Sequence, residues 1–272
     1  SYFMLDFRNQ NRENHSENIR HSIYNIYGDS PSEVDENEQI GNYYKMNEWR
    51  LETEYRKPIA KNTYLNLNYV VSNTKEQTDK DVLDFNPTNN TYEDFDALLS
   101  ADYSINKKVR RPLVRFNYEN DKFYSSFTTS FVNVTLENKD FMRDADFTKK
   151  FNDVTVNGRM KYKFKEGGNI SVRYNTRSRV PSVAQLQAVP NVNNPLNVIV
   201  GNPDLKRAYS HYASAEYNDY NIKKKSGFFV SGSYNVTNDQ VVGISTTDAN
   251  LLRKTTYTNV DGNNVGQLRT RF

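Results

Sequence analysis

A row of charged side chains at every second position is the feature of this sequence best suited to chemistry. The segment EWRLETEYR carries this charged row, whose members are Glu48, Arg50, Glu52, Glu54 and Arg56. The positions between them hold Trp49, Leu51, Thr53 and Tyr55. Carboxylates and guanidinium groups on one face of a strand bind through ion pairs and charged hydrogen bonds. The charged row can therefore contact a protein surface or a passing solute, or it can neutralise itself as a hydrated face.

Catalytic and metal-binding patterns are weak in this sequence. The histidines, His15, His21 and His211, are far apart, and there is no cysteine. The acidic stretches 29–38, 79–90 and 144–153 offer oxygen ligands but lack the spacing of a calcium-binding loop. We interpret His15, His21 and these stretches as hydrated loop residues. The sequence predicts no enzymatic activity, no bound metal and no cofactor.

The composition is that of a folded chain whose apolar residues are spread thinly. Only 36% of the 272 residues are hydrophobic and the mean hydropathy is −0.87, yet aromatic residues reach 13%. Disordered chains are poor in aromatic residues, so this chain is expected to fold. A net charge of +3 is too small to indicate nucleic-acid binding. The basic run KKVRR at 107–111 lacks interleaved aromatics, and we expect it to bind lipopolysaccharide phosphates or to stay hydrated.

The elements that must position these side chains are β-strands, because apolar and polar residues alternate with period two. Clear examples are TYLNLNYVV (63–71), TVNGRMKYKF (155–164) and FFVSGSYNV (228–236). Their length of about ten residues is that of a membrane-spanning strand. Their polar faces carry both signs of charge, as a hydrated lumen does, and aromatics lie near the strand ends. The pattern predicts an all-β, antiparallel transmembrane β-barrel, with a soluble β-sandwich as the alternative.

Connector lengths alternate along the chain. Short connectors lie at 58–62, 119–121, 165–169 and 223–227, and long polar ones at about 10–39, 74–92, 138–151, 179–207 and 241–253. Tight periplasmic turns and long extracellular loops are typical of outer-membrane barrels. Ten strands are predicted, at 1–9, 40–57, 62–73, 94–118, 122–137, 153–164, 169–179, 208–222, 227–240 and 254–272. The segment 94–118 is too long for the bilayer alone and should project or break, and Pro112 predicts a bulge near Arg110–Pro112.

The connector PSVAQLQAVPNVNNPLNVIVGNPDL (181–205) holds an ordered motif, and we expect it to be an exterior loop that its prolines stiffen. The loop-motif residues are Pro181, Gln185, Leu186, Asn194, Pro195, Gly201, Asn202, Pro203 and Leu205. Together with TYTNVDGN (256–263), the motif resembles the barrel region of TonB-dependent receptors, especially of the Bacteroidetes type. Arg207 and Ala208 depart from the Pro-Glu pair that often follows the motif lysine in that family.

The resemblance implies an outer-membrane barrel of about 22 strands in a Gram-negative bacterium. Its partners would be lipid and lipopolysaccharide, a plug domain in the lumen and TonB, contacted through an upstream segment. A surface lipoprotein is a further partner that the resemblance allows, and nucleic acid is not expected. Residues 1–272 would form a barrel segment, with the plug and the remaining strands outside it. The last strand, QLRTRF, would continue past Phe272 or end there naturally.

Two functions are consistent with these features. The first is energy-dependent uptake of a ligand through a TonB-dependent receptor, in which the charged row faces the plug. The alternative is a barrel without transport activity that acts as a surface-binding protein or an assembly scaffold. A plug and a TonB-contacting segment in the upstream sequence would favour the first function.

Overall fold

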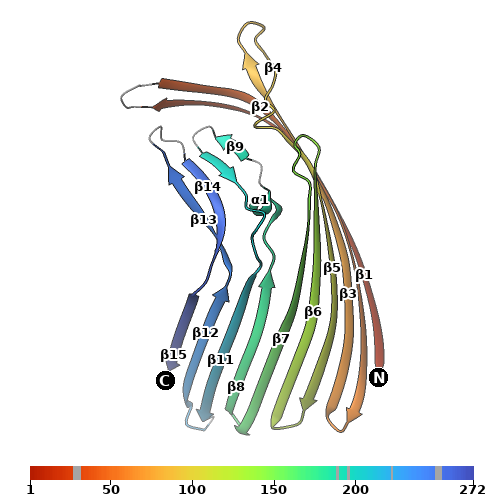
Figure 1. The fold of residues 1–272 in the computed structure, drawn as a ribbon. Coiled ribbons are helices and arrows are strands. Elements are labelled where there is room, and N and C mark those ends of the chain that lie inside the picture. The colour runs from red at the N-terminus through yellow and green to blue at the C-terminus, as the bar shows by residue number, and fades with distance from the viewer. Residues whose placement is uncertain (27–31, 188–189, 195–196, 222, 249–252) are drawn as a thin grey trace.

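The computed structural model describes residues 1–26, 32–187, 190–194, 197–221, 223–248 and 253–272. Most of them form one curved antiparallel sheet whose strands lie side by side in the order in which they occur along the chain (Figure 1). Its strands, in spatial order, are β1 (Tyr2–Ile26), β2 (Ser32–Ala60), β3 (Thr63–Asn86), β5 (Ala101–Glu119), β6 (Phe123–Asp140), β7 (Phe147–Lys165), β8 (Gly168–Arg179), β11 (Ala208–Asn221), β12 (Ser226–Asn238) and β15 (Asn263–Arg271). A short strand, β4 (Thr91–Phe95), pairs with the end of β3. The free edges of this sheet are β1 and β15.

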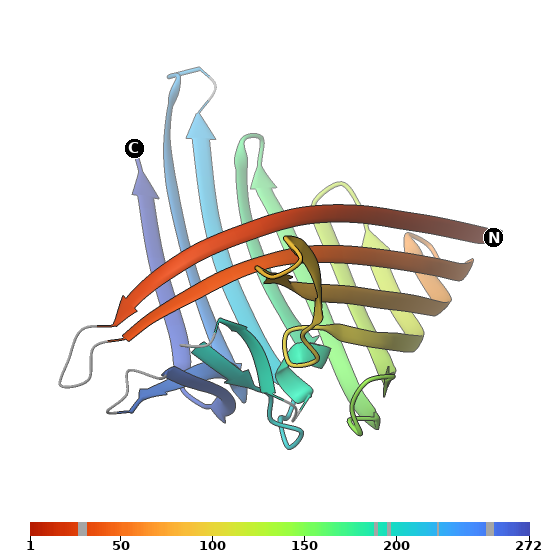
Figure 2. The same cartoon turned by 90° about the horizontal axis from the view of Figure 1, so that it is seen from above.

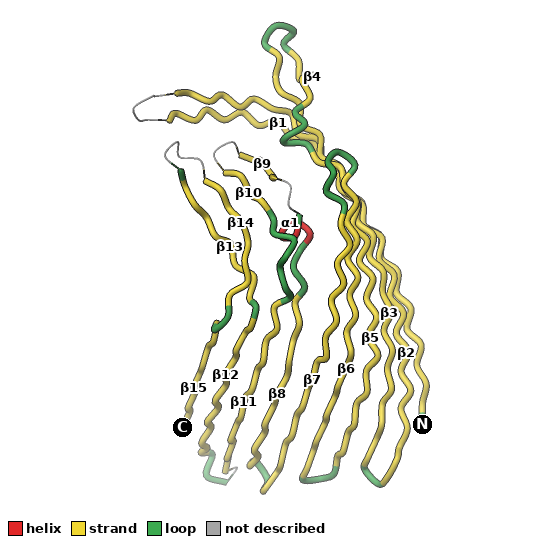
Figure 3. The backbone as a smooth tube through the Cα atoms, in the orientation of Figure 1, coloured by secondary structure: helices red, strands yellow, loops and turns green. Residues whose placement is uncertain are grey.

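A second, smaller sheet lies beside one end of the first. It contains β13 (Gln240–Thr247), β14 (Arg253–Val260), β10 (Asn197–Val200) and β9 (Pro190–Asn194), in that order. A short helix of one turn, α1 (Val183–Leu186), lies between the two sheets (Figure 3). No helix among the described residues is long and apolar enough to cross a bilayer.

The polarity of the main sheet is the reverse of that in a soluble protein. In β3 the amides Asn66 and Asn68 are 3% and 9% exposed, whereas Leu67 and Tyr69 between them are 45% and 43% exposed. The same alternation continues in β7, where Met160 and Tyr162 are 51% and 47% exposed. We call the concave, polar side the inner face and the convex, apolar side the outer face. An apolar outer face with a polar inner face is the arrangement of a membrane barrel wall.

The sheet has two different rims (Figure 3). Tight turns at 61–62, 120–122, 166–167 and 223–225 gather at one end, which we call the short-turn rim. Asn62, Lys225 and Gly167 take positive φ there, at 60°, 50° and 76°, as tight turns require. Connections of the main sheet within the described residues, such as 87–90 and 141–146, lie at the opposite end, which we call the long-loop rim (Figure 3). The predicted short connectors are confirmed as tight turns at one rim, whereas much of the sequence predicted as long connectors forms strands.

Several predicted strand ends were wrong. Residues 10–39 and 74–92 read as loops, yet β1 runs to Ile26, β2 begins at Ser32 and β3 runs to Asn86. Beyond the bilayer a strand needs no apolar face, so the sequence shows no alternation although the backbone ladder continues. Strands β6 and β7 likewise extend into 138–151, and β13 occupies much of 241–253. The predicted strand 254–272 divides at 261–262 into β14 and β15, which belong to different sheets.

The long segment 94–118 does contain the predicted break. Residues 96–100 separate β4 from β5, and the Asp96 carboxylate accepts hydrogen bonds from the backbone N–H groups of Leu98 (2.7 Å) and Leu99 (3.0 Å). The predicted bulge at Pro112 was wrong. Pro112 pairs with Tyr69 in an unshifted β3–β5 register, and the β5–β6 ladder keeps one register on both sides of Arg111 and Pro112.

Candidate binding surface on the inner face of the sheet

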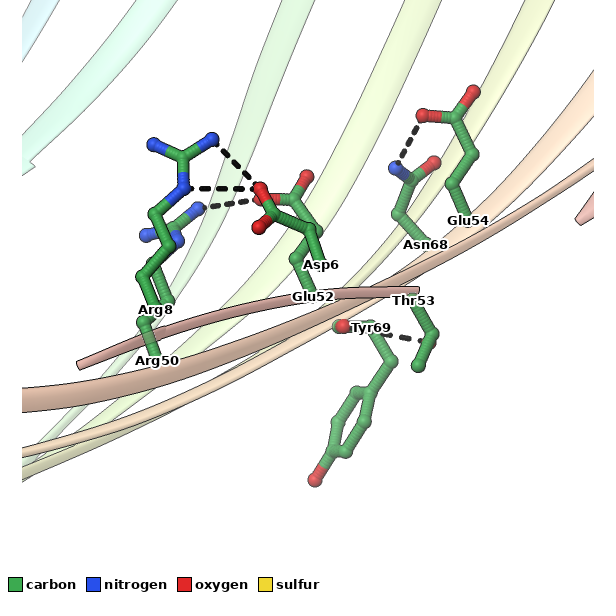
Figure 4. A network of polar contacts seen from close by, with 8 residues as sticks. All are labelled: Asp6, Arg8, Arg50, Glu52, Thr53, Glu54, Asn68 and Tyr69. Carbon is green, nitrogen blue, oxygen red and sulfur yellow. Dashed lines mark hydrogen bonds and ion pairs between the residues drawn. The ribbon is translucent and has the colours of Figure 1, made fainter. Parts of the chain in front are cut away.

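The charged row of β2 lies on the inner face, between β1 and β3 (Figure 4). Like charges meet across the β1–β2 ladder, because Arg50 pairs with Arg8 and Glu52 pairs with Asp6. Such pairs are unfavourable unless other charges offset them. Each arginine therefore binds the carboxylate on its own strand, with Arg8 Nη2 2.6 Å from Asp6 Oδ2 and Arg50 Nη2 2.8 Å from Glu52 Oε2. The four side chains form a compact, mutually neutralised cluster.

Glu54 anchors the polar network on the short-turn side of that cluster. Its carboxylate accepts hydrogen bonds from Tyr2 Oη (2.8 Å), Asn66 Nδ2 (2.5 Å) and Asn68 Nδ2 (3.1 Å). The Arg56 guanidinium lies 4.1 Å from the centre of the Tyr64 ring. These bonds support the self-neutralising interpretation of the charged row. Contact between the charged row, including Glu48, and a plug stays a prediction.

Two parts of the loop motif, 181–187 and 201–205, fold against each other into a compact unit, which we call the motif cap. Ser182 and Gln185 form a reciprocal capping box around α1. The chain then returns along the helical turn, where the Gly201 N–H donates to Gln187 O (2.9 Å) and the Asn202 N–H donates to Gln185 O (2.7 Å). A Cβ atom on Gly201 would lie 2.3 Å from Gln187 O, so only glycine fits this approach.

The motif cap covers an apolar cluster on the inner face at the long-loop rim. Leu186 and Leu205, which are 1% and 4% exposed, pack with Val183 and with Leu136 of β6. Ile105, Phe147, Phe151, Val241 and Tyr257 surround this cluster. The Asn202 amide donates to Tyr257 O (2.9 Å), which ties the cap to β14. The motif thus lies at the long-loop rim but is ordered, because its leucines pack against Leu136 of β6.

The remaining motif residues have different positions. Pro181 is buried next to α1, Pro203 lies in the turn before β11, and Asn194 ends β9. Pro195 lies outside the described residues. Arg207, where the sequence departs from the family pattern, forms an ion pair with the buried Asp153 of β7.

Two hollows on the inner face were not anticipated from the sequence. One, of about 580 Å³, lies against the motif cap and is lined by Arg177, Arg179, Pro181 and Gln185 together with side chains of β11, β12, β13 and β15. The other, of about 410 Å³, is lined by Arg111, Arg115 and Arg159 with hydroxyl and amide neighbours. Neither hollow has a carboxylate in its lining. The available signal was Arg173, Arg177 and Arg179, which lie on the same face of β8 at alternate positions interrupted by Asn175.

The long-loop rim has the opposite electrostatic character. A hollow of about 750 Å³ is lined there by Asp35, Glu36, Glu38, Asp84 and Asp96 with apolar neighbours. Burial, together with repulsion from Asp96, Glu38 and Asp94, raises the pKa of the Asp84 carboxyl above its ordinary value. Asp84 lies near the outer end of β3, more than 20 residues from the turn at 61–62 and outside the bilayer-spanning part of that strand.

Parts of the predicted loop stretches fall in strands, whereas 87–90 and 144–146 lie in connections between strands and 29–31 lies outside the described residues. His15 and His21 lie in β1, and His21 Nε2 is 2.7 Å from Asp35 Oδ1. Within the described residues no group of three or more histidine or acidic side chains could hold a metal ion. Of the basic run 107–111, Lys108 Nζ binds Glu137 Oε1 at 2.8 Å. Binding of lipopolysaccharide by this run stays a prediction.

Three solved structures share the fold at low sequence identity. The copper transporter OprC aligns over 94% of this chain and 39% of its own, with 10% identity and a TM-score of 0.62. The Serratia marcescens hemophore receptor HasR, solved with HasA and heme, aligns over 99% and 50%, with 10% identity and a TM-score of 0.55. The ferric citrate transporter FecA aligns over 97% and 36%, with 8% identity and a TM-score of 0.53. The chain thus spans at most half the length of these structures.

No curated protein matches the sequence. The model of the outer membrane protein beta-barrel family, in contrast, matches residues 2–270. The reversed polarity of the sheet, its antiparallel order and its alternating rims agree with that match. This protein therefore belongs to the outer membrane protein beta-barrel family and resides in the outer membrane of a Gram-negative bacterium.

Proposed function

We propose that this chain is part of the barrel of a TonB-dependent receptor that imports a ligand across the outer membrane. The observation that carries the proposal is the polar, hollowed inner face. A polar interior is typical of outer-membrane barrels, and the concave hollows on this face give a solute places to bind along the wall. The fold shared with two transporters and a hemophore receptor supports the same conclusion.

The proposal includes further strands and a plug. The sheet ends at β1 and β15, and each strand leaves one row of backbone groups unpaired in this sheet. Unpaired groups in hydrocarbon cost several kcal/mol each, so in the membrane both edges need partner strands. We place those strands in the same protein, because the matched structures are two to three times longer than this chain. A plug in the lumen would contact the charged row and would couple the barrel to TonB.

A non-transport function is the second candidate, and the β1–β2 hairpin favours it. At about 3.3 Å per residue, the 25-residue β1 is about 80 Å long, far more than a bilayer requires. The outer part of this hairpin crosses above the mouth of the sheet toward β13 and β14 (Figures 1 and 2). A long ribbon at the surface suits the binding of another macromolecule as well as the capture of a small ligand.

The two candidates differ in their need for energy. Wild-type cells and cells with the gene deleted can be grown in the same medium, and solutes lost from the medium identified by mass spectrometry. Transport predicts at least one solute whose depletion requires both the gene and an intact proton gradient, and which is spared when an uncoupler is added. Depletion profiles that do not depend on the gene would instead favour the scaffold function.

A further inference from the structure

The inner face is divided into two electrostatically different walls. On β1 and β2 two inner-face arginines are neutralised, because Arg8 binds Asp6 and Arg50 binds Glu52. On β8 the guanidinium groups of Arg177 and Arg179 have no carboxylate partner within the described part of the chain, and both side chains are exposed. A pair of arginines without a carboxylate partner in a concave hollow creates a local positive potential that concentrates anions.

The hollow beside these two arginines has the dimensions of a small-molecule site. Its volume of about 580 Å³ lies within the range of about 300–1,000 Å³ that ligand pockets occupy. The motif cap forms one side of it through Pro181 and Gln185, and the lumen wall forms the other. The cap is fixed by the capping box and by the apolar cluster under Leu186. The site therefore rests on ordered elements.

The remaining lining supplies neutral hydrogen-bonding groups. Asn175, Ser210, Asn235 and Thr237 project from three adjacent strands of the inner face. The hydroxyls of Ser210 and Thr237 lie 2.9 Å apart and can donate outward as well as to each other. Guanidinium groups bind carboxylate, phosphate and sulfonate oxygens through paired hydrogen bonds, and amides and hydroxyls complete the shell of such ligands. A cation would find no carboxylate in this hollow.

We propose that this hollow binds a small organic anion that carries two or more carboxylate, phosphate or sulfonate groups. The proposal rests on the transport function above and names the chemical class of its cargo. Arg177 and Arg179 bind the acidic groups, and the amides and hydroxyls of β8, β11 and β12 bind the rest of the molecule. A second row of arginines, Arg111, Arg115 and Arg159, lines the neighbouring hollow of about 410 Å³ and gives the anion a next position along the wall.

An acidic surface of a plug domain is the competing occupant of the same wall. A protein surface fits a flat or continuous patch, whereas the positive groups here line separate concave hollows. The concave shape favours a small ligand, and the following experiment distinguishes the two occupants.

The test uses the full-length protein purified in detergent and the trisulfonated dye 8-hydroxypyrene-1,3,6-trisulfonate as probe. Fluorescence anisotropy of the dye should show saturable binding to the wild-type protein. The double variant Arg177→Gln/Arg179→Gln should bind the dye at least about tenfold more weakly, because it loses both guanidinium groups that donate charged hydrogen bonds to the sulfonates. The control, Lys223→Gln/Lys224→Gln, removes the same charge from an exposed turn and should bind like the wild type.

Three results would overturn the proposal. They are absence of saturable dye binding to the wild type, an equal loss of affinity in both double variants, and unchanged affinity in the arginine variant. A lower melting temperature of the arginine variant with unchanged dye affinity would assign the arginines to a plug contact. The heat-modified electrophoretic band confirms folding of each variant. Energy-dependent solute depletion is measured separately in cells. The depletion experiment therefore tests the transport proposal, and the dye experiment tests the anion site, each independently of the other.

Discussion

Gly201 shows how one residue holds the motif cap together. A Cβ atom at this position would lie 2.3 Å from Gln187 O, 2.8 Å from Gln187 N and 2.9 Å from Ala184 O. All of these are backbone atoms, so the clash cannot be relieved by rotating a side chain. We expect Gly201→Ala to lower the free energy of unfolding by about 1–3 kcal/mol. Urea titration of the refolded protein, followed by the heat-modified band, measures the change.

Gly232 in β12 provides the matched control for this prediction. No atom lies within 4 Å of the Cβ position there, so Gly232→Ala should leave stability unchanged or slightly raise it. An equal loss in both variants would mean that the effect reflects β-sheet glycines in general and not the packing of the motif cap.

Asp84 shows the cost of gathering carboxylates at the long-loop rim. Its pKa is raised by burial and by repulsion from Asp96, Glu38 and Asp94, and Glu38 faces it directly across the β2–β3 ladder. An aspartate with a raised folded-state pKa destabilises the fold once pH rises through that pKa. Asp84→Asn should therefore have a higher melting temperature than wild type at neutral pH. The difference should vanish below about pH 3.9, where the unfolded-state carboxyl is also protonated.

An exposed aspartate serves as the control for the Asp84 experiment. Asp121 lies in a tight turn at the short-turn rim, away from the acidic hollow. Asp121→Asn should follow the wild-type melting temperature at every pH. A stabilisation that persists unchanged into the acid range would show that packing, and not charge, is responsible.

At the scale of the element, the two faces of β7 should respond differently to added charge. Met160 pairs with Val172 on the outer face, where it is 51% exposed, whereas Lys161 lies on the inner face. We expect Met160→Arg to cost about 2–4 kcal/mol if the residue lies near the bilayer midplane, because the cation must enter hydrocarbon. Lys161→Arg should cost almost nothing. Unfolding in lipid vesicles measures both, and equal tolerance would contradict a lipid-facing outer face.

Elements that cross the bilayer were predictable from the sequence, and those beyond it were not. The alternation in TVNGRMKYKF and TYLNLNYVV follows from having lipid on one side and water on the other. Outside the bilayer both faces of a ribbon are wet, so RNQNRENHSEN in β1 has no period that would identify it as a strand. The break before β5 was predictable from length alone, whereas the division at 261–262 needed knowledge of which sheet each half joins.

The candidate site was predictable only in part, for a related reason. The charged row was found because its members are consecutive alternate residues of one strand. The arginine hollow combines Arg177 and Arg179 with side chains from β11, β12, β13 and β15, and only the sheet order brings these together. The inward fold of Leu186 likewise depends on Leu136, which is 50 residues away in the sequence.

At the scale of the whole molecule, the two rims predict a fixed orientation in the membrane. Long connections face the cell exterior and tight turns face the periplasm in outer-membrane barrels. The native chain has no cysteine, so single cysteines can be introduced cleanly. With a membrane-impermeant maleimide on intact cells, Asn89→Cys at the long-loop rim should be labelled and Lys224→Cys should not. The converse pattern would reverse the orientation, and labelling of Lys224→Cys after cell lysis confirms that the site is reactive.

The continuous pairing of β1 with β2 makes their hairpin one extended ribbon from the lumen wall to the region beyond the membrane. The pairing runs without a register shift from Tyr2 opposite Arg56 to Ile26 opposite Ser32. One end of this stiff ribbon lies beyond the membrane, and the other carries Asp6, Arg8, Arg50 and Glu52 on the lumen wall. No loop or register shift interrupts the hairpin between its outer part and the lumen wall. The outer part of the hairpin and the charged cluster on the lumen wall are thus joined by one continuous pair of strands.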